Sequence, residues 1–198
     1  MTIKQELDLI LAKWDLLKHP FYQAWSARTL PVESLRLYAR EYGAFVGTIP
    51  IGWKTLEDHN TFQEEQEHAA LWADFTNAIG GTTGAPELPQ TIELSRKAMN
   101  LFASPVSALG ALYAFEAQQP ATALSKLEGL KAHYDMPEVG AKYFELHVAN
   151  LGESAKILEQ IKSLSPTAQA EACMACESMA ESLWSALTGI HESAMLGD

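Results

Sequence analysis

Helical periodicity runs through almost the whole of this 198-residue chain, and prolines mark its interruptions. Apolar residues recur at the i, i+3, i+4, i+7 spacing of an amphipathic helix, as at Ile3, Leu7, Ile10 and Trp14. The sequence shows neither the alternating Val, Ile and Thr runs typical of strands nor a repeat of constant length. The pattern therefore predicts an all-α bundle of seven to eight helices.

Short connections separate the expected helices. The clearest break is the stretch "GGTTGAPELP", whose length of about ten residues suits a connection between helices better than a domain linker. Connections this short place sequential helices side by side and antiparallel. We therefore expect a single domain over residues 1–198, with helices at 3–14, 31–50, 60–80, 91–104, 105–118, 120–134, 139–164 and 166–191 and shorter helical pieces at 20–27 and 51–59.

Charge and cysteine content limit the partners. Lys and Arg number 14 against 25 Asp and Glu, and the resulting net charge of −11 repels nucleic acid and anionic lipid. The sequence also lacks an apolar run of about 18 residues that could span a membrane. We expect a soluble, cytoplasmic protein without nucleic-acid or membrane partners. Cys173 and Cys176 form a CxxC, but they lie in a helix-favouring stretch and are interpreted as small packing residues.

Glu116 is the only charged residue between Pro105 and Ala123. Burying a carboxylate in so apolar a helix costs several kcal/mol unless the group is paired, protonated or bound to a metal. Glu116 is therefore a site candidate, with a structural salt bridge as the alternative.

His147 lies in the apolar stretch "YFELHVANLGES", where it is either a ligand or a core histidine bonded to a backbone carbonyl.

A third candidate region is the segment "EEQEH". Glu64 lies four positions before His68 and Glu65 three positions before it, so either acid can share one helix face with the imidazole. The spacing of Glu65 matches the ExxH pattern of carboxylate-bridged di-iron bundles. The same cluster of charges also fits a solvated face. Motifs for a phosphate loop or a nucleophilic hydrolase are absent from the sequence.

Several motifs together resemble a known superfamily. They are "HPFYQAW", "EHAALW", "LYAFEAQQP", "ALSKLEGLKAHY", "YFELHVAN" and "MAESLWSALTGI", and they extend from about His19 to Ile190. The chain resembles the heme-oxygenase-like superfamily that includes the TenA and PqqC proteins, and most closely the CADD-like di-iron oxidases. The resemblance implies a heme-oxygenase-like bundle, a homodimer and a small-molecule substrate.

The resemblance also implies a metal site made by Glu64, His68, Glu116 and His147. In the family six residues separate the first acid from its histidine, whereas three separate Glu64 from His68, and Glu65 remains its rival. The family continues from the position of His147 with an aspartate and a second histidine. The corresponding residues here are Leu151, which cannot bind iron, and Ser154, which is a poor ligand for it. One iron ion is therefore expected rather than two, with no metal at all as the alternative.

Three functions follow from these residues. The preferred one is an iron-dependent oxidase or oxygenase acting on a small organic substrate. The second is a catalytically degenerate TenA/CADD-like protein that binds a small molecule or acts as a dimeric interaction module. The third is cofactor-free chemistry in the TenA manner, with Glu41, Tyr42 and Glu181 as the candidate catalytic residues of the pocket. TenA hydrolases also use a pocket cysteine, and the two cysteines here lie on the last helix instead.

Overall fold

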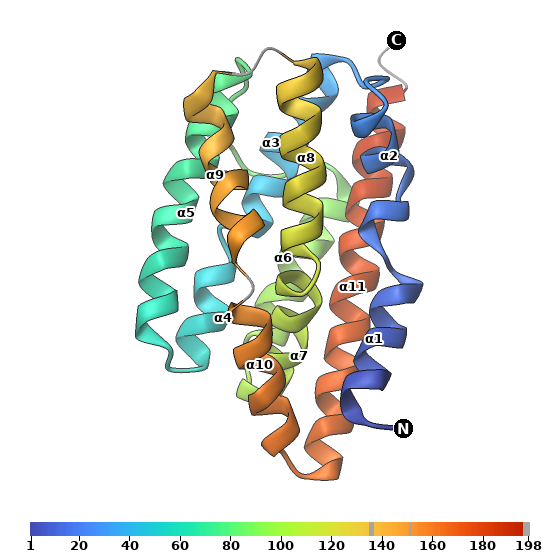
Figure 1. The fold of residues 1–198 in the computed structure, drawn as a ribbon, viewed down its shortest axis with the longest axis vertical. Helices are drawn as coiled ribbons and strands as arrows, with labels where there is room; N and C mark the ends of the chain where they lie inside the picture. The colour runs from blue at the N-terminus through green and yellow to red at the C-terminus, as the bar shows by residue number, and fades with distance from the viewer. Residues whose placement is uncertain (135–136, 151, 196–198) are drawn as a thin grey trace.

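Helices pack into one bundle in this computed structural model, which describes residues 1–134, 137–150 and 152–195 (Figure 1). No strand occurs within these residues, so the all-α prediction is confirmed. The short pieces predicted at 20–27 and 51–59 are separate helices, and the subdivision is finer than predicted because of a 3-10 helix at Leu16–Lys18 and a break within 139–164. The elements are α1 (Ile3–Lys13), the 3-10 helix η1 (Leu16–Lys18), α2 (Pro20–Ser26), α3 (Val32–Val46), α4 (Ile49–Thr55), α5 (His59–Ala78), α6 (Pro89–Leu101), α7 (Pro105–Glu116), α8 (Gln119–His133), α9 (Glu138–Ala149), α10 (Gly152–Ser163) and α11 (Pro166–Met195).

Local sequence signals explain where several helices begin. Thr2 and Gln5 form a reciprocal capping box at the start of α1. Ser104 caps α7 directly before Pro105, which suits the first helical position because that position needs no N–H donor. The start of α5 differs from the prediction. Its cap is Asp58, whose side chain accepts the backbone N–H of Thr61, so the helix begins one position earlier than expected.

The most deeply buried helix is α7, in which every residue from 108 to 116 is buried. It packs against α4, α10 and above all α11, the 30-residue helix that runs most of the length of the molecule in Figure 1. Gly110 lets the two backbones approach, since a Cβ there would lie 2.0 Å from the carbonyl oxygen of Ala172. The burial of α7 places its last residue, Glu116, inside the bundle.

The predicted helix over residues 139–164 is two helices in the structure. Asn150 caps the end of α9 with an extended backbone (φ −87°, ψ 91°), and α10 begins at Gly152. The prediction of one continuous helix was therefore wrong, because Asn150 leaves the helical conformation. Leu151, one of the two altered ligand positions, lies outside the described residues.

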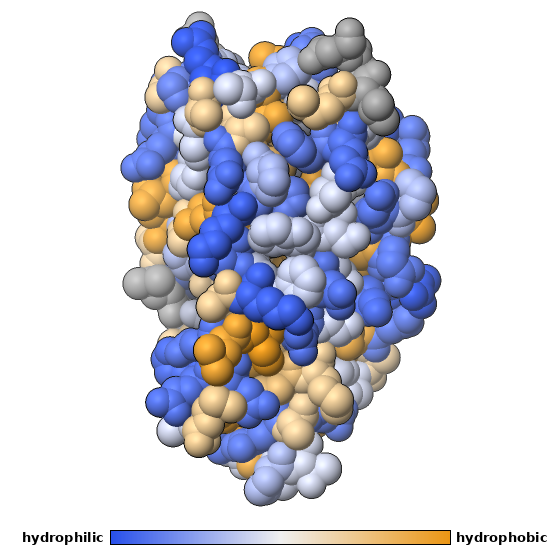
Figure 2. All heavy atoms as spheres, turned by 90° about the vertical axis from the view of Figure 1, so that its right-hand side faces the viewer, coloured by the Kyte–Doolittle hydropathy of each residue, from blue (hydrophilic) through white to orange (hydrophobic). Residues whose placement is uncertain are grey.

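The surface on the side of α1, α2 and α11 is mainly hydrophilic, with hydrophobic side chains gathered in its lower half (Figure 2). Leu9 and Met174 are among the large exposed hydrophobic residues of α1 and α11. Among the described helices, none combines the length and apolar character required to cross a bilayer. Cys173 and Cys176 are free thiols buried on α11, in agreement with a packing role.

Candidate metal centre

Five acids and histidines converge where α5, α7, α9 and α10 meet. They form two groups, and within each group one ligand atom per residue lies within 4.8 Å of the others. Glu65, His68 and His147 make up the first group. The second contains Glu65, Glu116 and Glu153, so Glu65 belongs to both. Four separate helices thus contribute to one polar cluster inside the bundle.

The two residues from α5 lie one turn apart on its inner face. Glu65 is only 2% exposed, and its carboxylate lies 3.1 Å from Nδ1 of His68. Glu64, in contrast, is exposed and belongs to neither group. The structure therefore places Glu65, and not Glu64, beside the histidine. Burial alone would lower the pKa of His68, but its hydrogen bond to Glu65 and the surrounding carboxylates raise it.

His147 presents a free ring nitrogen to the cluster. Its Nδ1 lies 2.6 Å from the backbone carbonyl oxygen of Tyr143. Because a carbonyl oxygen can only accept, Nδ1 carries the hydrogen and donates this hydrogen bond. Nε2 is therefore the unprotonated nitrogen, and it is buried without a hydrogen-bond partner in the described part of the chain. The ring lies 4.6 Å from that of His68 between centroids. Burial lowers the pKa of His147 to about 4, which keeps the imidazole in the neutral form that binds metals.

Glu116 is an unpaired carboxylate in an apolar helix. It is 3% exposed, and its Oε1 has no hydrogen-bond partner among the residues that the structure describes. None of the ion pairs formed within the described residues includes it, so the alternative of a salt bridge finds no support there. Burial and the neighbouring charges of Glu65 and Glu153 raise its pKa well above the ordinary value.

Glu153 is a member of the cluster that the sequence analysis missed. It lies in the first turn of α10 and is 6% exposed, and burial followed by the charge of Glu65 raises its pKa. The comparison with the family drew attention to positions 151 and 154, and Glu153 falls between them. Its spacing from Ile157 and Ile161, which are both buried on the same face of α10, was the signal that could have identified it.

The donor set fits a divalent metal ion. Two imidazoles and three carboxylates are the ligands that iron and manganese take in helical bundles. Two of the donor atoms, Nε2 of His147 and Oε1 of Glu116, are buried and without a partner. An unsatisfied buried carboxylate is costly in a folded protein, and a bound cation would remove that cost.

Glu41, a catalytic candidate from the sequence, is engaged in hydrogen bonds at the start of α6. It is fully buried on α3, and its carboxylate accepts hydrogen bonds from the backbone N–H groups of Glu87 and Leu88 and from the hydroxyl of Thr91. Arg40 donates to the same carboxylate. Glu41 thus caps the start of α6, and it has no role in either group of the cluster.

The other two pocket candidates also lie outside the cluster. Glu181 is exposed on α11. Tyr42 is buried and stacks on Tyr38 with 5.1 Å between ring centroids. The structure therefore does not bring Glu41, Tyr42 and Glu181 together with the metal-ligand candidates.

Aromatic rings enclose one side of the cluster, and a buried lysine lies among them. Tyr143 packs against His147, with 4.2 Å between ring centroids. Lys126 is 2% exposed on α8, its Nζ lies 3.4 Å from the hydroxyl of Tyr38, and it sits 5.3 Å from the ring centroid of Tyr22. Burial lowers the pKa of Lys126 to about 7. Lys126 was not predicted from the sequence, although its position one turn before the buried residue Leu130 on the same helix face was a signal.

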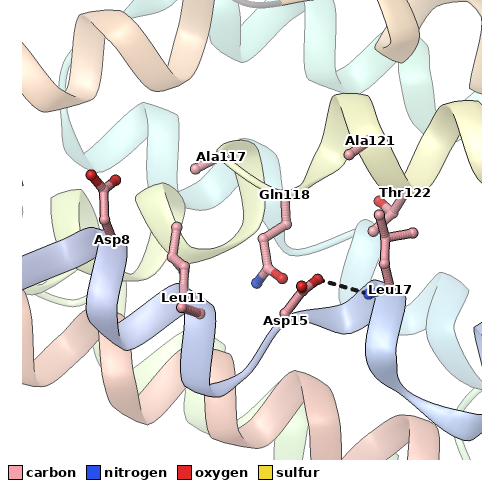
Figure 3. Close-up of a pocket in the computed structure, with 9 residues that line it drawn as sticks. Asp8, Leu11, Asp15, Leu17, Ala117, Gln118, Ala121 and Thr122 are labelled. Atoms are coloured by element: carbon pink, nitrogen blue, oxygen red, sulfur yellow. Dashed lines mark hydrogen bonds between the residues drawn. The ribbon is translucent and has the colours of Figure 1, made fainter.

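A surface pocket of about 290 Å³ lies apart from the cluster, between α1, η1 and the junction of α7 with α8 (Figure 3). Its polar side chains are already engaged. Asp15 accepts the backbone N–H of Leu17, and Gln118 accepts that of Leu16 while donating to the carbonyl of Ala114. No residue of the metal-ligand groups lines this pocket. We therefore place the candidate site at the buried cluster.

Known proteins agree with this fold. A family described as iron-containing redox enzymes matches residues 53–150, a range that includes four of the five cluster residues. A 4-aminobenzoate synthase from Nitrosomonas europaea is 31% identical, over 97% of this chain and 92% of its own length. A solved domain of unknown function with a heme oxygenase-like fold, from Shewanella denitrificans, superposes with a TM-score of 0.82 at 15% identity and covers 100% of this chain and 95% of its own. A CADD-like protein of unknown function from Nostoc punctiforme gives a TM-score of 0.73 at 17% identity, covering 99% of this chain and 96% of its own. The chain therefore belongs to the iron-containing redox enzymes of the heme-oxygenase-like superfamily.

Proposed function

We propose that this protein is an iron-dependent oxidase or oxygenase whose centre is the cluster of Glu65, His68, Glu116, His147 and Glu153. The observation that carries the proposal is the pair of buried, unpartnered donor atoms, Nε2 of His147 and Oε1 of Glu116, inside a set of metal-binding side chains. Bound iron would supply the activation of dioxygen. The carbonyl of Tyr143 holds the His147 ring with Nε2 toward the centre, and the aromatic rings around it exclude water.

We further propose that the product is 4-aminobenzoate. The support is the similarity to the 4-aminobenzoate synthase of Nitrosomonas europaea, which extends over nearly the whole of both chains. A protein of the same name from Chlamydia muridarum is 25% identical over 98% of this chain. The small-molecule substrate and the homodimer expected from the sequence are part of the same proposal. Sedimentation equilibrium of the purified protein tests the dimer.

A growth assay tests the product. The gene is expressed in a bacterial strain that requires 4-aminobenzoate, and growth is followed without that supplement. We expect the wild type to restore growth and the His147→Gln and Glu116→Gln variants to fail, because both substitutions remove a donor atom from the centre. Glu64→Gln is the matched control, since this exposed carboxylate neighbours Glu65 and belongs to neither group.

Purified protein provides the second readout. Wild type and variants are reconstituted anaerobically with Fe(II) and mixed with the small-molecule fraction of a lysate of the 4-aminobenzoate-requiring strain, which supplies the substrate. They are then exposed to dioxygen with a reductant and assayed for 4-aminobenzoate by mass spectrometry. Wild type and Glu64→Gln should form the product, and Glu116→Gln should lose at least 90% of it. Equal product from all three proteins, or none from the wild type in either assay, would rule out the proposed reaction.

A further inference from the structure

We infer that Glu153 is a metal ligand that compensates for the altered ligand positions at Leu151 and Ser154, and that the cluster holds two divalent ions bridged by Glu65. The inference rests on the proposed iron-dependent function and deepens it. The sequence led us to expect a single ion, and Glu153 was not among its expected ligands. Three features of the described residues carry it.

The first feature is the division of the cluster into two groups. Ligands of one iron-sized ion lie about 2.1 Å from it, so two donor atoms on the same ion are at most about 4.2 Å apart. The five side chains do not form a single set of donor atoms within 4.8 Å, but they form two such sets. Glu65 is the member common to both sets, and a carboxylate has two oxygens with which to bridge two ions.

The second feature is charge. Glu65, Glu116 and Glu153 are between 2% and 6% exposed and carry three negative charges when ionised, whereas neutral histidines carry none. Within the described residues no lysine or arginine forms an ion pair with any of the three, and the one ion-pair partner is His68 beside Glu65, whose imidazole is neutral when it binds a metal. One divalent ion leaves one of these charges uncompensated in a buried site, while two ions compensate all three. Glu116, whose Oε1 has no hydrogen-bond partner among the described residues, belongs to the group without histidines, where the second ion would bind.

The third feature is the break between α9 and α10. His147 lies in the last turn of α9, and the extended backbone at Asn150 ends that helix. The new helix puts Glu153 in its first turn, on the same buried face as Ile157 and Ile161. Ser154, which occupies the family's second histidine position, is only half-buried. The break therefore allows an acid at position 153 to reach the cluster.

Metal stoichiometry tests the inference without any measurement of product. Protein is loaded anaerobically with Fe(II), freed of loose metal, and analysed for bound iron. We expect two ions per chain in the wild type and one in Glu153→Gln, whose histidine group remains intact. Glu159→Gln is the control, because Glu159 is exposed on the same helix and pairs with Lys162 at the surface. It should retain two ions.

Loading with Mn(II) gives an independent readout. Two ions bridged by one carboxylate couple magnetically, so the wild type should show the electron paramagnetic resonance spectrum of a coupled pair. Glu153→Gln should show the spectrum of an isolated ion. Glu153→Asp keeps a carboxylate but shortens its reach, and it should bind the second ion at least tenfold more weakly. This variant also provides the answer if Glu153→Gln does not fold, which circular dichroism would reveal.

The metal measurements and the product assays test the two-ion site and the proposed reaction independently. One ion in the wild type, or two ions that persist with unchanged affinity in both Glu153 variants, would overturn the inference even if 4-aminobenzoate is formed. Two ions in the wild type, one in Glu153→Gln and no product would uphold the inference and reject the proposed reaction.

Discussion

The carboxylate of Glu41 is fully buried in α3, and it stabilises the start of α6 through three donors from residues 87, 88 and 91. Glu41→Gln keeps the size of the side chain but removes its charge and turns one acceptor into a donor. We expect the free energy of unfolding to fall by roughly 2–3 kcal/mol, the cost of weakened hydrogen bonds to a charged group. Urea denaturation measures the change. Iron content should stay at the wild-type value, and a loss of iron would contradict the structural role.

The same residue predicts a pH dependence. Burial raises the pKa of Glu41, but the hydrogen bonds from Thr91, from the backbone of α6 and from Arg40 outweigh burial and lower it below the ordinary 4.5. The stabilisation is therefore complete above pH 4.5 and is lost as the pH falls through the lower pKa of the folded state. The stability difference between wild type and Glu41→Gln should shrink in acid. A difference that grows below pH 4.5 would contradict this assignment.

The buried amine of Lys126 destabilises the folded protein, whereas the buried carboxylate of Glu41 stabilises it. Burial lowers its pKa from 10.5 to about 7, so the unfolded chain binds an additional proton between these values and wild-type stability rises with pH across this window. Lys126→Met removes the cost of the buried amine. At pH 6 the variant should be more stable by roughly 2–4 kcal/mol. Its advantage should disappear as the pH approaches 10.5. Thermal denaturation at several pH values measures this, and an equal advantage at every pH would refute it.

Single residues also show how far the sequence can identify the site. Glu116 and His147 were singled out because each is a polar group in an apolar stretch, and His68 because of its helical spacing from Glu64 and Glu65. Neighbouring residues on a helix point only about 100° apart, so the pattern alone left Glu64 and Glu65 unresolved. Glu153 could not be reached by counting from His147 along one helix, because the helix ends between them.

At the scale of elements, periodicity and proline positions were sufficient to predict an all-α bundle. These signals are local, and they report which face of a helix is buried. The break at Asn150 was not predicted, because neither proline nor a glycine in a left-handed conformation marks it within the described residues. Its conformation depends on how α9 and α10 pack against other helices, which a local pattern does not contain.

The contact between α7 and α11 predicts the effect of one methyl group. A Cβ at Gly110 would lie 2.0 Å from the carbonyl oxygen of Ala172, so Gly110→Ala forces two helix backbones apart. We expect a loss of about 3 kcal/mol or more, as is typical of overpacking against a rigid partner. Gly47→Ala is the control, because its Cβ would meet nothing closer than 3.5 Å at a helical φ of −63°. Chemical denaturation should show a change of less than about 1 kcal/mol for this control.

At the scale of the whole molecule, the cluster joins residues from position 65 to position 153 and four helices that are otherwise held by apolar packing. In the metal-free protein its carboxylates repel one another, and burial and this repulsion raise the pKa of Glu116. The same groups that destabilise the metal-free bundle would stabilise the loaded one. Metal binding and global stability are therefore coupled.

This coupling predicts an inversion of melting temperatures. Fe(II) at 100 times its dissociation constant should stabilise the wild type by about 2.7 kcal/mol per ion, or roughly 5–10 °C for a chain of this size. Glu116→Gln replaces a buried carboxylate by a neutral group of the same shape. Its metal-free form should therefore melt at or above the temperature of the metal-free wild type, while its shift on adding Fe(II) should be at most half as large. Scanning calorimetry with Fe(II) or a chelator under anaerobic conditions compares the two proteins. A structural carboxylate would behave differently, because its loss would lower the melting temperature with and without metal and leave the Fe(II) shift unchanged.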